Sequence, residues 1–322
     1  MNYSDNAINV LSVKSYRGVG RAWIMKNMKG NESINTIVDL LNQHLKETIT
    51  VEDFYTTRQL MVNKIMRLKN HIDGVVAIGD DNFPSHRGNV KQSEQPVVLF
   101  YRGDLSLLNK SNKNIAVIGL LTPDSNIEDI EKKIVSELIK HKITIVSGLA
   151  LGCDSIAHKQ AIDSNGTTIA ILPSSLDDIL PASNKVLAKE IISKNGLLVT
   201  EYYEKAKSKQ ELASRYQDRD RLQALFSDGI ILSASYAKND QGNDSGSRLA
   251  MKYALNYSIP RAVLYNFQTN GNDPKYDLNR QIINEDSNVI VINSENLTTS
   301  LKIIIEKTHR VIYKPLSITD FL

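Results

Sequence analysis

The sequence is poor in the residues that build covalent or metal-linked frameworks. Its 322 residues include one cysteine, Cys153, and one tryptophan. A single thiol excludes an intrachain disulfide and a metal site built from several cysteines. No apolar run approaches the roughly 20 residues that a membrane-spanning helix needs, and residues 1–10 lack the charged and then apolar pattern of a signal peptide. We therefore expect a cytoplasmic protein with no membrane partner.

Catalytic patterns are also scarce. The sequence has no Gly-Lys-Ser/Thr loop of an ordinary nucleoside triphosphatase and no His-x-x-x-His pair that would favour a metal site. Cys153 and His158 are five residues apart, off a common helical face, which disfavours a nucleophile–base pair. We expect no enzymatic activity, no cofactor and no metal. The 39 basic and 36 acidic residues leave a net charge of +3, which by itself does not indicate a nucleic-acid partner.

Residues 1–74 are predicted to form a small helical domain. Apolar residues recur there at helical spacing and share one face, namely Ile34, Ile37, Val38, Leu41 and Leu45. The segment Gly18-Val19-Gly20 comes before them. Two interpretations of it stay open, a tight turn between helices or a hairpin whose backbone N–H groups approach a nucleic-acid phosphate.

Residues 75–308 are predicted to form an α/β domain with a Rossmann-like, mostly parallel sheet and helices on both faces. Seven short runs rich in β-branched residues alternate with helical stretches, as expected of strands covered on both sides. The pattern Ser-x-x-Glu from Ser125 to Glu128 predicts a capping box at the start of the first such helix. Runs 75–78 and 97–101 are expected to connect or extend the sheet, and 309–322 to form a short tail. The seven runs are 115–118, 143–146, 168–172, 197–200, 229–232, 262–265 and 289–292.

Four loops that follow predicted strands carry most of the candidate binding residues. In an open parallel sheet, ligands bind beyond the carboxyl ends of the strands, where helix N-termini point. The loop within 147–158 is the most distinctive, because its two glycines let the backbone pass close to an anion such as phosphate. Ordinary capped turns between strand and helix are the alternative. The candidate phosphate-binding or DNA-binding residues of these loops are Gly119, Ser147, Gly148, Gly152, Asp154, Asn184, Lys185, Ser245, Gly246 and Ser247.

A basic stretch with interleaved tyrosines lies between the fourth and fifth runs. Its cations outnumber its acids, and Arg219 and Arg221 join the candidate DNA-binding residues. Tyr202, Tyr203 and Tyr216 offer aromatic surfaces on which bases stack. The alternative is a solvated, charged helix face that binds nothing.

Together these loops resemble the DprA/Smf family of DNA-processing proteins. The densest match is SGLALGCDSIAHKQA at 147–161, which is similar to the family pattern SG-x-A-x-G-[IV]-D-x-x-AH-x-x-A. The resemblance implies a single-stranded DNA-binding protein that loads a RecA-type recombinase during natural transformation, and a domain that commonly forms a homodimer. It also implies that Gly18 to Gly20 form the turn of an N-terminal hairpin. The other matches follow in the family's order, GTTIAIL at 166–172, LPASNKVL at 180–187, GLLVTEY at 196–202, RDRLQALFS at 219–227 and SGSRLAMKYAL at 245–255.

The departures from the family pattern concern charge. Where the family has Gly-Ser/Thr-Arg after the first strand, Gly119 is followed by Leu120 and Leu121, so one DNA-contacting cation is absent. The family's Arg-Asn-Arg is Arg-Asp-Arg here, because Asp220 stands between the arginines, and residues 232–235 (LSAS) replace its usual Val-Glu-Ala. Loss of one phosphate contact lowers the slope of log K against log salt by about one unit.

Two functions fit the sequence. The first is sequence-tolerant binding of single-stranded DNA by the glycine-lined loops and the neighbouring cations. The second is a Rossmann-like nucleotide-binding sensor, in a pathway such as antiphage defence, that has lost strong DNA binding. The Pro-Gly-Gly-x-Gly-Thr loop of related hydrolases is absent, and Glu201 is the one acid that invites a catalytic role. Within the second function we therefore expect sensing rather than catalysis.

Overall fold

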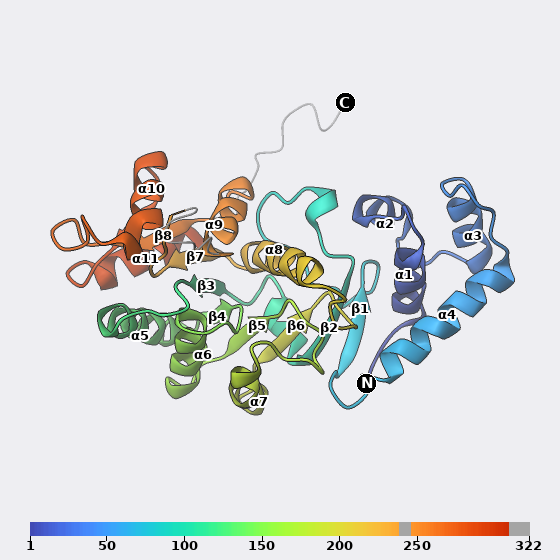
Figure 1. Ribbon diagram of the computed structural model, residues 1–322, viewed down its shortest axis with the longest axis horizontal. Coiled ribbons are helices and arrows are strands. Elements are labelled where there is room, and N and C mark those ends of the chain that lie inside the picture. The colour runs from blue at the N-terminus through green and yellow to red at the C-terminus, as the bar shows by residue number, and fades with distance from the viewer. Residues whose placement is uncertain (238–245, 309–322) are drawn as a thin grey trace.

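The computed structural model describes residues 1–237 and 246–308. In these ranges the chain forms a nine-stranded sheet with helices on both faces and a further group of helices at one end (Figure 1). The strands lie side by side in the order β1-β2-β6-β5-β4-β3-β7-β8-β9. The predicted α/β fold class, Rossmann-like and mostly parallel, is confirmed. The predicted tail at 309–322 lies outside the described residues.

Strands β3 to β9 are parallel to one another and agree with the seven predicted runs to within one residue at each end. Most of their residues are apolar and nearly all are buried, on both faces of the sheet, which is why the strands could be recognised without an alternating pattern. They are β3 (Asn114–Ile118), β4 (Thr144–Ser147), β5 (Thr168–Ile171), β6 (Leu197–Thr200), β7 (Gly229–Leu232), β8 (Arg261–Leu264) and β9 (Ile290–Ile292).

Two antiparallel strands extend this sheet at the β6 edge. β2 (Val98–Gly103) pairs with β6, and β1 (Gly74–Ala77) pairs with β2. The two runs predicted to connect or extend the sheet therefore extend it.

Successive side chains of each strand pack against helices on opposite faces. In β3, Ile115 and Val117 belong to one apolar cluster, and Ala116 and Ile118 belong to another. The first face carries α5 (Ser125–Lys140), α6 (Cys153–Asp163), α11 (Leu297–Thr308) and, beside α6, α7 (Lys185–Ser193). The second face carries α8 (Lys209–Leu225), α9 (Gly246–Asn256) and α10 (Asp277–Glu285).

Within the two described ranges, every helix is too short or too polar to span a membrane.

The strand order reverses between β3 and β7. From β3 the chain steps through β4 and β5 to β6, and from β7 it steps the opposite way through β8 to β9. Open α/β sheets bind ligands at such a reversal, in the crevice beyond the carboxyl ends of the strands. The loops after β3 and β7 flank that position.

Helix α5 is capped one residue earlier than the sequence predicts. The Asp124 side chain accepts a hydrogen bond from the backbone N–H of Ile127 at 3.0 Å, and Ser125 is the first residue of the helix. The predicted cap at Ser125 is wrong, because aspartate is an equally strong capping residue and occupies the preceding position.

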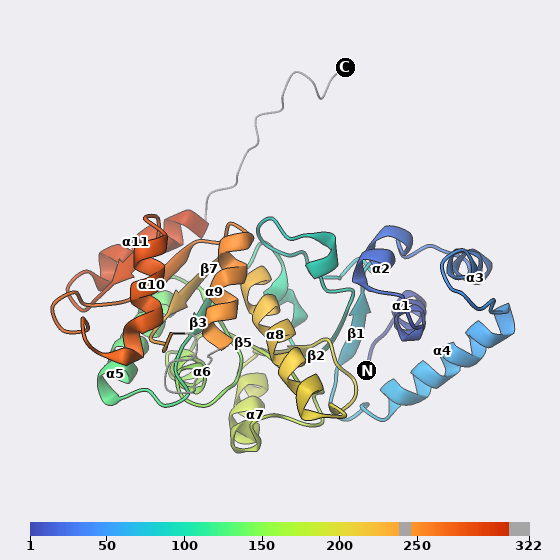
Figure 2. The same cartoon turned by 45° about the horizontal axis from the view of Figure 1, so that its top comes forward.

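Four N-terminal helices stand beside β1 at one end of the sheet in both views (Figures 1 and 2). Ile8 and Leu11 pack in the same apolar cluster as Val98 and Phe100 of β2, so these helices and the sheet bury a continuous core. The predicted domain boundary at residue 74 falls at the start of β1 and stays a prediction. The helices are α1 (Asp5–Ser15), α2 (Arg21–Asn27), α3 (Ile34–Asn42) and α4 (Val51–Met66).

The segment Gly18-Val19-Gly20 forms the turn between α1 and α2. Gly18 has a φ of +92°, a conformation that favours glycine, and Gly20 is the N-cap of α2. The first interpretation, a tight turn between helices, therefore describes its structure, and contact with a phosphate stays a prediction.

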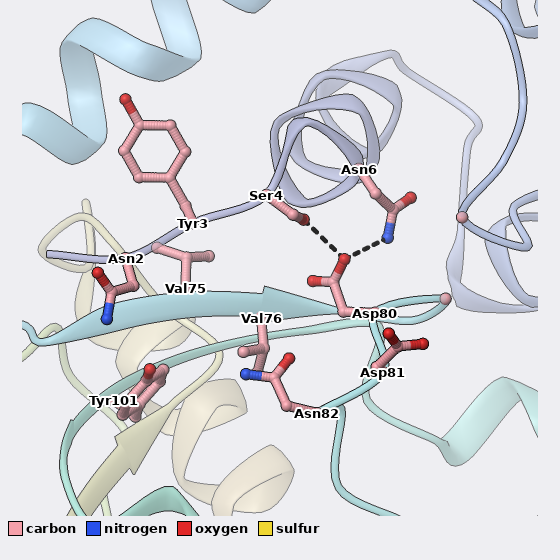
Figure 3. Close-up of a pocket in the computed structure, with 12 residues that line it drawn as sticks. Asn2, Tyr3, Ser4, Asn6, Val75, Val76, Asp80, Asp81, Asn82 and Tyr101 are labelled. Atoms are coloured by element: carbon pink, nitrogen blue, oxygen red, sulfur yellow. Dashed lines mark hydrogen bonds between the residues drawn. The ribbon is translucent and has the colours of Figure 1, made fainter.

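A cavity of about 600 Å³ lies between the N-terminal segment and the loop after β1 (Figure 3). Asp80 holds this junction together, because its carboxylate accepts hydrogen bonds from Ser4 Oγ at 2.6 Å, Asn6 Nδ2 at 2.9 Å and the backbone N–H of Ala77 at 2.8 Å. The ionised groups that line the cavity are Asp80 and the exposed Asp81. An acidic lining repels phosphate, so this cavity is a poor place for a nucleic-acid backbone.

Replacing Asp80 with alanine is expected to lower the free energy of unfolding by about 2 kcal/mol, because three hydrogen bonds to a charged group are lost. The matched control is Asp81→Ala, which removes a neighbouring exposed carboxylate and is expected to change stability by less than about 0.5 kcal/mol. Guanidinium denaturation followed by circular dichroism measures both. Equal losses in the two variants would contradict this role of Asp80.

Candidate functional site

The loops after β3 and β4 are in close contact at the carboxyl edge of the sheet. Gly152 has a φ of +70°, and a Cβ placed there would lie 2.3 Å from the carbonyl oxygen of Leu120. The backbone N–H of Cys153 donates to that same carbonyl at 2.9 Å. Gly119 is equally confined, since a Cβ on it would lie 2.6 Å from Cys153 Sγ. These glycines allow two loops to pack together.

The amides of the second loop bind a carboxylate of the protein itself. Asp154 Oδ2 accepts hydrogen bonds from the backbone N–H groups of Gly148 at 3.1 Å and Ala150 at 3.2 Å. Asp154 is buried. The Gly148 amide, one of the donors that the sequence assigned to a phosphate, is therefore occupied by an internal anion.

Arg219 reaches this loop from α8. Its guanidinium donates to the carbonyl of Gly148 at 3.1 Å and to Asp220 Oδ1 at 2.8 Å, and it lies 3.5 Å from Asp154 Oδ2. A Cβ on Gly148 would lie 1.8 Å from Arg219 Nη1, so glycine is needed for the guanidinium to fit. Burial raises the pKa of Asp220 to about 6, against the opposing charge of Arg219. Arg219 is itself buried and saturated with internal partners.

Arg221 is engaged at a second internal joint. It donates to Glu201 and to the carbonyl of Glu94, and its side chain is buried. Arg21 of α2 joins the same group through ion pairs with Glu201 at 3.2 Å and Asp218 at 3.0 Å. This network ties α8 and the end of β6 to the N-terminal helices. Glu201, considered above as a catalytic acid, is a buried partner of two arginines.

The remaining predicted site residues divide into structural and exposed groups. Ser147 Oγ donates to the carbonyl of Val117 at 2.7 Å, and Ser247 Oγ donates to the carbonyl of Gly119 at 3.3 Å. Ser247 thereby brings the start of α9, with Gly246, against the β3 loop. Ser245 lies outside the described residues.

Asn184 and Lys185 mark the start of α7. Asn184 Nδ2 donates to the carbonyls of Leu149 at 2.8 Å and Ala150 at 3.1 Å, so it fixes α7 to the β4 loop. Lys185 is exposed and makes no ion pair within the described residues. Of the predicted cations, Lys185 is available to a ligand at this edge, whereas Arg219 and Arg221 are not.

The loop that lacks the family arginine has a cation beside it. Lys275 Nζ lies 2.5 Å from Asp124 Oδ2, and this hydrogen bond lowers the pKa of Asp124. Leu120 is buried, while Leu121 points outward with 61% of its surface exposed. An exposed apolar side chain, Leu121, therefore stands where the family pattern has the arginine. The nearby lysine, Lys275, is already paired with Asp124.

The tyrosines of the basic stretch are partly covered. The Tyr202 hydroxyl donates a hydrogen bond to Asp218 Oδ2 at 2.7 Å. The guanidinium carbon of Arg215 lies over the Tyr202 ring, 4.1 Å from the ring centroid. The ring of Tyr216 lies 5.5 Å from the Arg219 guanidinium. The Tyr216 ring packs against an arginine of its own helix, and Tyr202, in the segment after β6, packs against Arg215 of that helix, so both rings are engaged with α8.

Sequence reasoning missed a buried acid beneath the β3 loop. Glu131 of α5 is fully buried and faces the Ser233 hydroxyl and the Cys153 thiol, yet neither makes a hydrogen bond of good geometry to its carboxyl. Burial raises the pKa of Glu131 to about 8 and raises the pKa of the Cys153 thiol. The signal was its spacing, because Glu131 lies four residues after Ile127 on the apolar face of α5.

This acid makes stability depend on pH. An unfolded chain loses the proton of Glu131 near pH 4.5, whereas the folded chain keeps it until about pH 8. Stability is therefore fully present below pH 4.5 and falls as the pH rises towards 8. Glu131→Gln replaces the titrating carboxyl with a neutral amide. The free energy of unfolding of this variant is therefore expected to fall less steeply from pH 5 to pH 8 than that of the wild type. The two slopes are expected to differ by up to about 1.4 kcal/mol per pH unit.

The matched control is Glu128→Gln, which changes a partly exposed glutamate one turn earlier on α5. Its pH profile is expected to follow that of the wild type in guanidinium denaturation at pH 5, 6, 7 and 8. The assignment is wrong if Glu131→Gln and Glu128→Gln both reproduce the wild-type profile.

Two solved structures of DNA-processing proteins are similar to this chain. The structure of DNA processing protein A from Streptococcus pneumoniae matches with a TM-score of 0.68 and 21% identity over 94% of this chain and 98% of that chain, which shows the fold. A structure from Helicobacter pylori matches with a TM-score of 0.53 and 26% identity over 70% of this chain and 97% of that chain. That structure describes the single-stranded DNA binding mode of the Helicobacter pylori protein.

Sequence relatives lead to the same family. DNA processing protein DprA of Streptococcus pneumoniae is 30% identical over 193 residues, 58% of this chain and 63% of that protein. Protein Smf of Synechocystis is 31% identical over 165 residues, 51% of this chain and 39% of that protein. The chain thus matches less than two thirds of the length of these relatives. The family model for DNA recombination-mediator protein A matches residues 74–302, so the chain belongs to the DNA recombination-mediator protein A family, whose members include the DprA and Smf proteins.

Proposed function

We propose that this protein binds single-stranded DNA without sequence preference, acts as a recombination mediator, and delivers the strand to a RecA-type recombinase. The observation that carries the proposal is the family match over residues 74–302, together with the single-stranded DNA binding described for the Helicobacter pylori relative. A homodimer in the cytoplasm and a role in natural transformation are parts of the same proposal.

The geometry favours the carboxyl edge of the sheet as the DNA contact. Helices α5, α6, α7 and α9 are among those that begin at this edge, and the loops after β3, β4 and β5 touch one another there. Helix N-termini carry partial positive charge, and Lys185 adds a full charge at the start of α7. With Arg219 and Arg221 held internally, few cations contact phosphates, so we expect a shallow dependence of affinity on salt.

The sensor function has less support. A small nucleotide bound at the strand reversal needs free donors for its phosphates, and Asp154 occupies two of them. Asp154 and Asp220 also place two carboxylates around one guanidinium at that position. A thermal-shift screen with mononucleotides and cyclic dinucleotides tests the sensor directly. Stabilisation by one nucleotide without saturable oligonucleotide binding would select it.

Binding is measured by fluorescence anisotropy with labelled oligo-dT over a series of salt concentrations. The wild type is expected to bind saturably and more tightly than it binds a duplex of equal length. Lys185→Ala is expected to reduce the slope of log K against log salt by about 0.7, the loss of one phosphate contact on a single strand.

The matched control is Lys194→Ala, which removes an exposed lysine beyond the other end of α7 and should leave the slope unchanged. Absence of saturable oligo-dT binding at low salt would reject the proposed function. Recombinase delivery is tested by the DNA-dependent ATP hydrolysis of a RecA-type recombinase on oligo-dT coated with single-strand-binding protein, which this protein should accelerate.

A further inference from the structure

Five apolar side chains lie in the segments that follow five neighbouring strands, four of them in loops and Val186 in the first turn of α7. In sheet order the strands are β5, β4, β3, β7 and β8. Four of the side chains are 46–66% exposed and Tyr236 is partly buried. We call this row the apolar track; its members are Val186 after β5, Leu151 after β4, Leu121 after β3, Tyr236 after β7 and Phe267 after β8.

Contacts between the loops keep the members of the track in one row. Asn184, two residues before Val186, is hydrogen-bonded to the carbonyl of Ala150 beside Leu151. A Cβ on Gly152 would lie 2.5 Å from the carbonyl carbon of Leu121. The first three members therefore sit on segments that touch each other, namely the start of α7 and the loops after β4 and β3.

The far end of the track is joined to Leu121 through the core beneath it. Leu120 packs in a cluster with Tyr265, and Tyr236 packs against that cluster. The Phe267 ring meets Tyr265 edge-on, with 5.1 Å between centroids. Tyr265 thus supports the Phe267 ring from within the core.

Three of the acids in the loops near the track are paired with cations. Asp124 pairs with Lys275 at 2.5 Å, Asp178 pairs with Lys205 at 3.3 Å, and Asp220 pairs with Arg219 at 2.8 Å. Lys185 stands next to Val186 and makes no ion pair within the described part of the chain. These pairs reduce the repulsion of a polyanion at this edge, yet the edge offers few phosphate contacts.

We propose that the apolar track binds the bases of single-stranded DNA, so that contact with bases supplies most of the affinity at this edge. The inference rests on the proposed function and adds the part of the strand that is recognised. Five neighbouring strands span about 19 Å, the length of a few nucleotides. A row with one side chain per strand fits a linear polymer, whereas a protein partner would call for a broad patch.

The position of Leu121 supports this occupant. Leu121 follows Gly119 and Leu120 in the loop where the family resemblance places a DNA-contacting arginine. An apolar side chain there cannot hold a phosphate, but it can pack against the face of a base. Aromatic and apolar platforms of this kind accept any base, because every base has a π-face.

The experiment compares two labelled oligomers of equal length, oligo-dT and a chain of abasic deoxyribose phosphates. Wild-type protein is expected to bind oligo-dT at least tenfold more tightly than the abasic chain. Leu121→Ser and Phe267→Ala are each expected to weaken oligo-dT binding about tenfold and to leave abasic binding unchanged. Their salt slopes should stay at the wild-type value, in contrast to Lys185→Ala.

Leu255→Ser is the matched control, because Leu255 is 53% exposed at the C-terminal end of α9, away from the carboxyl edge. Its affinities for both oligomers should equal those of the wild type. Circular dichroism melts of all variants verify folding, and the exposure of Leu121 and Phe267 predicts melting temperatures close to the wild type.

The outcomes separate the inference from the function it rests on. If wild-type protein binds neither oligomer, the proposed function fails. If it binds both equally, or if Leu121→Ser weakens both equally, the apolar track is not a base-binding site and the proposed function stands. Sedimentation equilibrium tests a second copy as occupant, since a change of oligomeric state in Leu121→Ser with an unchanged preference for oligo-dT would assign the track to a subunit contact and overturn the inference.

Discussion

The buried ion pairing of Arg219 determines the shape of the carboxyl edge. One guanidinium meets two carboxylates, Asp154 and Asp220, and also binds the carbonyl of Gly148. Removing a partner from such a group leaves an uncompensated buried charge, which costs about 3–5 kcal/mol. Because Asp154 also holds the amides of Gly148 and Ala150, the same group fixes the loop that carries Leu151 and Gly152. The position of this loop at the carboxyl edge therefore depends on Arg219 of α8, a helix on the second face of the sheet.

Glycine in these loops serves the contacts of the protein with itself. A Cβ would collide with Arg219 at Gly148, with the Leu120 carbonyl at Gly152 and with Cys153 at Gly119. The sequence pattern of closely spaced glycines after a strand is the same whether the backbone approaches a phosphate or another loop. Which of the two occurs depends on whether an internal anion such as Asp154 occupies the amides.

The fold could be predicted well from the sequence because its signals are local. A strand buried on both faces gives an unbroken apolar run, and strand–helix alternation dictates a parallel sheet, so β3 to β9 were placed within one residue. The convergence of the loops followed from that topology alone. Their partners could not be predicted, because Arg219 reaches Gly148 across 71 residues and no local pattern encodes that contact. The cap of α5 shows the limit at short range, since Asp124 and Ser125 are both good caps in adjacent positions.

Leu121, which stands where the family pattern has an arginine, suits the task of a recombination mediator. Such a protein must accept strands of any sequence, and the side chains of Val186, Leu151, Leu121 and Phe267 carry no hydrogen-bonding group that could distinguish one base from another. Phosphate contacts weaken as salt rises, whereas apolar contacts with bases do not depend on counterion release. The parallel sheet brings these side chains to one edge, because the segments that carry them follow different strands. Apolar side chains at this edge bind bases without distinguishing between them, which is the property that strand delivery requires.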